Sequence, residues 1–159
     1  MSKEKLFERF ITENLDNAYR FAFIYVNDRQ LAEDIVSDSV VRALKSLHRL
    51  KSEEFLKTWF YKIIANTARS FLKRSSKIVY MEDAEIEKYM VLYENNSRLY
   101  FEEMIKNLPA DYKSIIALRF FEDMKISEIS NILDMNENTV KTKLYKALKI
   151  LKAEMEGDK

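Results

Sequence analysis

The sequence contains a single glycine, Gly157, and a single proline, Pro109, in 159 residues. Folds built from strands and tight turns need such residues at their corners, where glycine supplies positive φ and proline sets the chain direction. A chain with almost none of either is expected to be helical. Hydrophobic residues make up 47% of the chain, which is enough for a packed core and argues against wholesale disorder. We predict an all-α protein.

Charge is unevenly distributed along the chain, although the net charge is only +1. Residues 1–75 carry 14 Lys and Arg against 10 Asp and Glu, and residues 76–97 carry 2 against 5. Residues 98–159 are balanced at 11 against 11, but five of the lysines lie on the last predicted helix. Two basic surfaces separated by an acidic connector predict two small helical domains, 1–75 and 98–159, joined by a linker at 76–97.

Three helices are predicted in the first domain from apolar residues at helical spacing. They cover residues 5–26, 31–47 and 55–73. Asn27 and Asp28 break the pattern after the first helix, and a polar loop is expected at 48–54. The spacing turns Leu15 of the first helix and Leu44 of the second toward the core with their apolar neighbours.

The third predicted helix combines aromatic residues with an unbroken positive charge. No acidic residue occurs between Phe55 and Met81, whereas lysines and arginines recur throughout. Such a helix could lie on a membrane surface, bind a partner helix or form a nucleic-acid platform. At this spacing Trp59, Ile63 and Ile64 are expected in the core rather than on a stacking surface.

Residues 125–152 read as two short helices joined by a tight turn. The turn, 134–138, is rich in residues that tolerate left-handed conformations and cap helices. In the second helix an apolar stripe faces a core: Val140, Leu144, Ala147, Leu148 and Leu151. The residues left outside are Lys141, Thr142, Lys143, Tyr145, Lys146 and Lys149. Lysine neutralises phosphates, and Thr and Tyr can reach base edges or thymine methyl groups. This pattern favours a helix-turn-helix that reads DNA with its second helix, over a hairpin whose lysines are merely solvated.

Catalysis is not expected from this chain. His48 is the only histidine, there is no cysteine, and the single glycine cannot build a Gly-rich phosphate loop. We therefore expect no enzyme activity, no metal, no cofactor and no small-molecule substrate. No apolar run approaches the length of a membrane span and the N-terminus is not a signal peptide, so we expect a cytoplasmic protein.

Several separated stretches resemble bacterial RNA polymerase sigma factors of the ECF (extracytoplasmic function) type, in the sigma-70 superfamily. LAEDIV at 31–36 and WFYKIIAN at 59–66 are similar to region 2 of that family, which typically reads AEDxxQxxF and then WLxxIAxN. The stretches that resemble region 4 are Leu108-Pro109, LRFF at 118–121, SEI at 127–129 and NTVKTKL at 138–144. Ser37 and Val40 depart from the usual Gln and Phe. Asp134 and Asn138 replace two usual glycines of the helix-turn-helix, and both residue types can adopt left-handed conformations.

The resemblance implies an alternative sigma factor that binds core RNA polymerase, recognises the −35 and −10 promoter elements and promotes promoter melting and transcription initiation. Region 2, at 1–75, would dock on the β′ clamp helices through Glu33, Asp34, Ser37, Asp38 and Arg42. It would also hold a flipped base of the −10 element in a pocket formed by the loop near Leu50, Lys51 and Ser52 together with Asn66. Lys62, Arg69, Lys73 and Arg74 would follow the backbone of the DNA. Region 4, at 98–159, would meet the β flap and read the −35 element through Asn138, Thr139, Lys141, Thr142, Lys143, Tyr145 and Lys146. The family also implies an anti-sigma factor as partner, often membrane-anchored.

A stand-alone helix-turn-helix repressor or activator is the alternative. It would need no polymerase and would usually dimerise on a palindromic site. The basic, aromatic block at 55–77 distinguishes the two hypotheses, because a simple repressor has no need of it. The near-neutral net charge further predicts weak binding to naked promoter DNA, with polymerase supplying most of the affinity.

Overall fold

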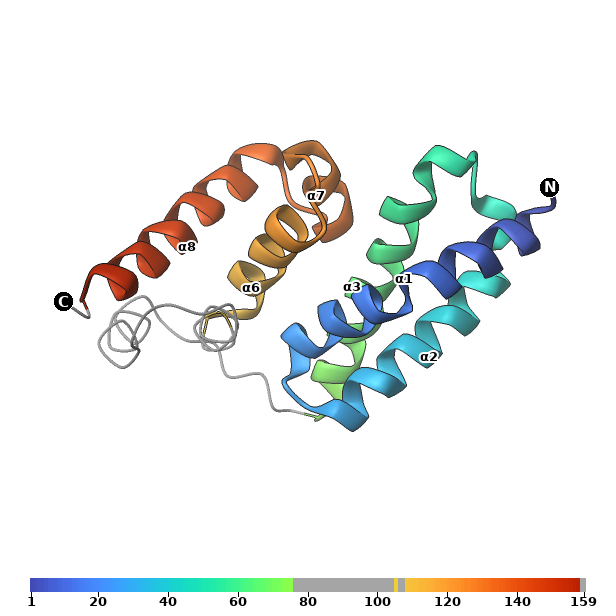
Figure 1. Cartoon of the computed structure of the whole chain (residues 1–159), viewed down its shortest axis with the longest axis horizontal. Helices are drawn as coiled ribbons and strands as arrows, with labels where there is room; N and C mark the ends of the chain where they lie inside the picture. The colour runs from blue at the N-terminus through green and yellow to red at the C-terminus, as the bar shows by residue number, and fades with distance from the viewer. Residues whose placement is uncertain (76–104, 106–107, 158–159) are drawn as a thin grey trace. The chain divides into compact units, whose positions relative to one another are not determined.

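The computed structural model of the chain describes residues 1–75, 105 and 108–157. Every regular element within these residues is helical, which confirms the all-α prediction (Figure 1). The chain divides into two compact units, one built on α1, α2 and α3 and the other on α6 and α8. The predicted linker at 76–97 and most of the helix expected before Pro109 lie outside the described residues. The domain limits given above therefore stay a prediction.

The first break in the chain is made by two caps. Helix α1 (Lys3–Val26) begins at Ser2, whose Oγ accepts from the backbone N–H of Lys5 at 3.2 Å. It ends at Asn27, which adopts the left-handed conformation with φ 51°. Asp28 then caps α2 (Arg29–Lys45), because its Oδ1 accepts from the backbone N–H of Leu31 at 2.9 Å. The predicted break at Asn27 and Asp28 is confirmed, and these caps are its cause.

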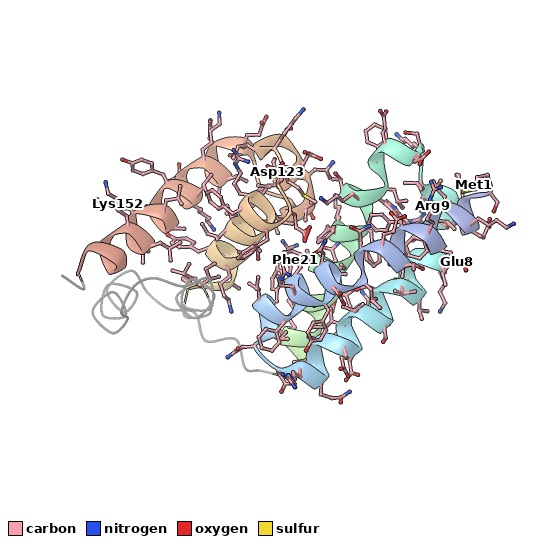
Figure 2. All side chains as sticks on the ribbon, viewed as in Figure 1. Met1, Glu8, Arg9, Phe21, Asp123 and Lys152 are labelled. Atoms are coloured by element: carbon pink, nitrogen blue, oxygen red, sulfur yellow. The ribbon has the colours of Figure 1, made fainter. Side chains whose placement is uncertain are left out.

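Aromatic side chains fill the core of the first unit, where α1, α2 and α3 (Leu56–Ser75) pack side by side (Figure 1). Phe60 is fully buried, with its ring centroid 5.5 Å from that of Phe7 and 5.8 Å from that of Phe10, both edge-on. Phe21, labelled in Figure 2, lies 5.3 Å from the ring of Tyr61. The edge-to-face pairs of Phe60 with Phe7 and Phe10 add to the free energy gained from burial alone.

Two predicted core positions of this unit are on its surface instead. Leu15 is 47% exposed and Leu44 is 51% exposed. The residues of α1 that are buried include Ala18, Phe21 and Tyr25. Apolar residues occur around more than half of the circumference of α1, so periodicity alone does not show which of them are buried.

The segment before α3 is more ordered than the predicted loop. It contains two short 3₁₀ turns, Leu47–Arg49 and Glu53–Phe55. Leu47, Leu50 and Leu56 are buried and anchor this segment to the bundle. In α3 the predicted core residue Ile64 is fully buried, while Trp59 and Ile63 are half-buried.

The described part of the chain after Pro109 contains a short helix with an irregular end, followed by two further helices. Helix α6 (Ala110–Ile116) follows Pro109 and runs into a π-helical turn, Ala117–Phe121. Asp123, labelled in Figure 2, has φ 52° and reverses the chain before α7 (Ile126–Leu133). Glu128 caps α7 by accepting from the backbone N–H of Lys125 at 3.0 Å. Helix α8 (Glu137–Gly157) is the last element.

Lys113 of α6 is unusual because it is a buried lysine, only 8% exposed. Burial lowers the pKa of Lys113 from 10.5 to about 8. The unfolded chain therefore binds more protons than the folded chain between pH 8 and 10.5, so stability rises with pH across that window. Below pH 8 the buried charge costs up to about 3 kcal/mol, and above 10.5 the cost is absent.

Replacing this lysine by an apolar residue of similar length should stabilise the protein. Lys113→Met is expected to raise the free energy of unfolding at pH 7 by about 1–3 kcal/mol. The difference between variant and wild type should shrink as pH rises from 8 to 10.5. Urea unfolding followed by circular dichroism measures both quantities. Lys146→Met, at an exposed lysine, is the control; a constant advantage of Lys113→Met at all pH values would contradict the explanation.

Candidate nucleic-acid interface

The turn between α7 and α8 is formed by local capping. Asp134 has φ 54°, so it takes the left-handed conformation expected of it as a substitute for glycine. The Oδ1 atom of Asn136 accepts from the backbone N–H of Thr139 at 2.8 Å and caps α8. Asn138 lies inside the first turn of α8 and is not left-handed, although its residue type can adopt that conformation. Since Asn136 provides the cap, the side chain of Asn138 stays exposed at the start of the helix.

One face of α8 carries polar and basic side chains in line. Asn138, Thr142, Tyr145 and Lys149 follow one another at intervals of four, three and four residues, which places them on the same side of a helix. All four are exposed, and Tyr145 is 73% exposed. The Oγ1–H group of Thr142 donates to the carbonyl of Asn138 at 2.9 Å, so its hydroxyl is bonded within the helix.

Lysines flank this line of residues, which we call the α8 face. Lys141 and Lys146 are exposed on either side of it, whereas Thr139 is half-buried. Lys149 was not among the predicted contacts, although its spacing from Tyr145 would have identified it. Lys152, labelled in Figure 2, extends the same charge toward the end of the helix. No acidic residue occurs between Glu137 and Glu154, so the α8 face suits a polyanion.

Lys143 points elsewhere. Its Nζ atom lies 2.7 Å from Oδ2 of Asp111 in the first turn of α6, and the two side chains are 30% and 47% exposed. The position is three residues after buried Val140 and four before buried Ala147, which puts it near the packed side of α8. The prediction that Lys143 faces outward therefore differs from the structure. Leu148, predicted to face the core, is 38% exposed.

The outward face of α2 carries the residues predicted to bind polymerase. Glu33, Asp34 and Ser37 are exposed. Asp38 and Arg42 are half-buried and pair with one another, with 3.1 Å between Oδ2 and Nε. Asp34 accepts from Nε2 of Gln30 at 3.1 Å. The prediction of these five residues as a surface is thus consistent with their positions, although two of the charges are already partnered.

Two apolar residues belong to the same side of α2. Ser37, Val41 and Leu44 follow Glu33 at intervals of four, four and three residues, which keeps all four on one face. Val41 is 47% exposed and Leu44 is 51% exposed. We call Glu33, Ser37, Val41 and Leu44 the α2 face. It combines an apolar centre with acidic neighbours, as protein-binding surfaces commonly do.

The residues predicted to contact the −10 element are spread over the turn before α3 and along α3 itself. Lys51, Ser52 and Lys73 are exposed, and Lys62 and Arg69 are half-buried. Leu50 is only 3% exposed, so most of its side chain belongs to the core, and its predicted contact with a base stays a prediction. The side chain of Arg74 lies outside the described residues.

A hollow opens beside the turn at the start of α3. The residues that line it are Arg49, Leu50, Lys51, Phe55, Thr58, Trp59, Lys62 and Asn131. Asn66 is not among them. It is exposed two helical turns beyond Trp59, where its Oδ1 accepts from Nη1 of Arg69 at 3.2 Å. The turn and Asn66 were predicted to form one pocket, and the structure does not bring them into the same hollow.

Within the described ranges, no cluster of three His, Cys, Asp or Glu side chains could hold a metal ion. The same residues include no helix that is both long and apolar enough to cross a membrane.

Comparison with known proteins identifies both units. Residues 10–78 match the family described as Sigma-70 region 2, and residues 98–151 match the family described as Sigma-70, region 4. The RNA polymerase sigma factor SigV of Bacillus subtilis is 42% identical over 146 residues, covering 91% of this chain and 88% of that protein. The ECF RNA polymerase sigma-E factor of Haemophilus influenzae is 25% identical over 135 residues, covering 74% and 71%.

A solved structure shares the fold. It is the sigma factor RpoE of Bartonella quintana in complex with the anti-sigma factor NepR. The TM-score is 0.76, and the alignment covers 96% of this chain and 98% of that one at 20% sequence identity.

Proposed function

This chain belongs to the sigma-70 family and is an ECF-type sigma factor, and from that premise we propose which of its surfaces bind polymerase and which bind promoter DNA. It is an alternative sigma factor that acts in transcription initiation. Members of this family bind core RNA polymerase and promoter DNA and are not enzymes.

The −35 element is assigned to the α8 face. Asn138 can pair with an adenine edge, and the methyl of Thr142 and the ring of Tyr145 can contact thymine methyl groups. Lys141, Lys146 and Lys149 would bind the phosphates on either side. The observation that supports this most is the line of exposed polar residues on a helix that has no acidic residue between Glu137 and Glu154 and whose opposite side is packed. Lys143 is left out of the set because it is paired with Asp111.

A matched pair of lysine variants tests this assignment. Lys141→Ala should weaken binding of the polymerase complex to the −35 element and reduce the slope of log K against log salt by about one. Lys143→Ala should leave that slope unchanged and lower the free energy of unfolding by up to about 1 kcal/mol. Fluorescence anisotropy over a salt series gives the slopes. Equal losses of slope in both variants would show that Lys143 also reaches DNA.

Polymerase binding is assigned to the α2 face, and the −10 element to the turn before α3 together with α3. The α2 face has the acidic residues and the apolar centre that a basic, helical partner surface such as the β′ clamp helices would need. Lys51 at the hollow and Ser52 next to it in the chain, with Lys62, Arg69 and Lys73 along α3, would hold the separated non-template strand. Region 4 would also meet the β flap.

A reconstitution assay tests the function as a whole. The purified chain should form a stoichiometric complex with bacterial core RNA polymerase and start transcription on promoters that core alone does not use. It should bind naked promoter duplex weakly at physiological salt. The absence of a polymerase complex, together with tight dimeric binding to a palindrome, would support the stand-alone repressor hypothesis.

An anti-sigma factor anchored in the membrane is the regulator that we propose, with this chain itself in the cytoplasm. Support comes from the structural neighbour, which is a sigma factor in complex with an anti-sigma factor. Cell fractionation tests the location and the anchoring together. The chain should co-sediment with membranes while the inhibitor is intact and appear in the cytoplasmic fraction after its loss. An inhibitor that remains soluble throughout would contradict the anchoring.

A further inference from the structure

The ion pair between Lys143 and Asp111 sets one lysine of α8 apart from the others. Lys143 is half-buried, and its Nζ atom lies 2.7 Å from Oδ2 of Asp111. The other four lysines of the helix are exposed: Lys141, Lys146, Lys149 and Lys152. One cation of the helix that is assigned to the −35 element is thus held by a carboxylate of the same protein.

Packing holds both ends of this pair in place. Helices α6 and α8 lie side by side and contact one another within the second unit (Figure 1). Asp111 is followed on α6 by a run of buried residues, 112–118. Lys143 lies on α8 between buried Val140 and buried Ala147. Because the two backbones are fixed, the pair loses only side-chain freedom when it forms.

Asp111 is an acidic residue that the fold brings to a basic helix. Helix α8 has no acidic residue of its own between Glu137 and Glu154, so Lys143 finds no carboxylate one turn away along α8. Asp111 belongs to the first turn of α6, where the backbone N–H groups favour a negative charge. Its ionised form is therefore the one expected to face Lys143.

Lys143 would reach DNA if it were released from this pair. It comes directly after Thr142 of the α8 face and three residues before Lys146, which flanks that face. Its ammonium group sits on a flexible four-carbon stem that can swing toward this flank. To bind a phosphate, however, it must leave Asp111, and the carboxylate left behind would be repelled by the DNA backbone. The pair therefore opposes one phosphate contact.

We propose that Asp111 restrains DNA binding by the free chain, because it keeps Lys143 from the phosphate backbone. This rests on the proposed assignment of the α8 face to DNA and adds an intramolecular control to it. Phosphate contacts carry no sequence information, so the restraint lowers the affinity for DNA of every sequence. It helps to keep the free chain off DNA until core polymerase delivers it to a promoter.

Salt titrations of the full chain with a labelled duplex that contains no promoter test this proposal. Asp111→Asn removes the negative charge and should steepen the slope of log K against log salt by about one. The affinity of this variant at about 0.1 M salt should rise roughly threefold to tenfold. Combining Asp111→Asn with Lys143→Ala should restore the slope of the wild type, because the released lysine is gone. Asp111→Glu keeps a carboxylate and should behave as the wild type.

Asp123→Asn is the matched control, since it makes the same change in net charge elsewhere in the second unit. The carboxylate of Asp123 lies 3.9 Å from Arg119 and not beside a lysine of α8. Its φ of 52° is one that asparagine also adopts, so the turn should be kept. This variant should leave the slope unchanged. Circular dichroism and urea unfolding show whether each variant is folded.

Lys141→Ala, measured in the same assay, separates failure of this proposal from failure of the proposed function. If Lys141→Ala lowers the slope and Asp111→Asn leaves it unchanged, the restraint is overturned and the α8 face keeps its role. A steeper slope that persists in the double variant would also overturn the restraint, because Asp111 would then repel DNA without acting through Lys143. If neither Lys141→Ala nor Asp111→Asn changes the slope, the α8 face does not bind DNA and both assignments fail.

Discussion

Leu44→Arg is expected to reduce the affinity of this chain for core RNA polymerase at least about thirtyfold, equivalent to 2 kcal/mol. Leu44 is 51% exposed on the α2 face, so binding would remove its remaining apolar surface from water. A buried leucine contributes about 1.5–3 kcal/mol relative to an exposed one, and roughly half of that is still available here. An arginine in its place forfeits this gain and adds a desolvated charge to a surface whose partner is expected to be basic.

Leu15→Arg is the matched control for this prediction. Leu15 lies in the same unit and is 47% exposed, but it belongs to α1 and not to the α2 face. The affinity can be measured by titrating labelled chain with core polymerase and following anisotropy. Leu15→Arg should bind as the wild type does. Equal losses in both variants would mean that the contact surface includes α1, and no loss in either would remove the α2 face from the interface.

Local chemistry explains why the helical architecture could be predicted from the sequence. The break between α1 and α2 depends on Asn27 and Asp28, and the turn before α8 on Asp134 and Asn136. Asp28 and Asn136 cap helices through hydrogen bonds within their own turns, and Asn27 and Asp134 adopt the left-handed conformation that their residue types allow. Such interactions do not depend on the rest of the fold, and residue type alone indicates them.

The errors arose where long-range packing decides. The ion pair between Lys143 and Asp111 joins residues 32 positions apart, and no spacing rule links them. Leu15 was assigned to the core because α1 has more apolar residues than its contacts with α2 and α3 can bury. Leu50 was assigned to DNA from its position in a matched loop, whereas the packing of that loop buries it.

In the candidate site, too, local patterns could be predicted from the sequence and the results of long-range packing could not. The outward residues of α8 were predicted because one side of the helix is apolar and the other basic. The apolar centre of the α2 face, Val41 and Leu44, was not predicted, because an exposed leucine and a buried one look alike in a periodic pattern. Phe55 was predicted only as part of a basic, aromatic block. Its 51% exposure follows from the path of the turn before α3.

Core packing in the first unit gives the largest expected effect on stability. Phe60 is fully buried and contacts the ring edges of Phe7 and Phe10. Phe60→Ala would leave a cavity between α1 and α3 and should cost about 3–5 kcal/mol. Small domains have a free energy of unfolding toward the lower end of about 5–15 kcal/mol, so this loss removes most of the stability of the first unit.

The single tryptophan makes this measurable in the intact chain, because Trp59 belongs to the first unit and packs against Phe7. Urea unfolding followed by its fluorescence should show a midpoint far below that of the wild type. Phe60→Leu keeps most of the side-chain volume and should lose less than half as much free energy of unfolding. Phe120→Ala, at a phenylalanine of the second unit that is 51% exposed, should not move the midpoint. A small shift for Phe60→Ala would mean that the core collapses around the missing ring. In that case the aromatic contacts would not be what stabilises the bundle that carries both the α2 face and the −10 site.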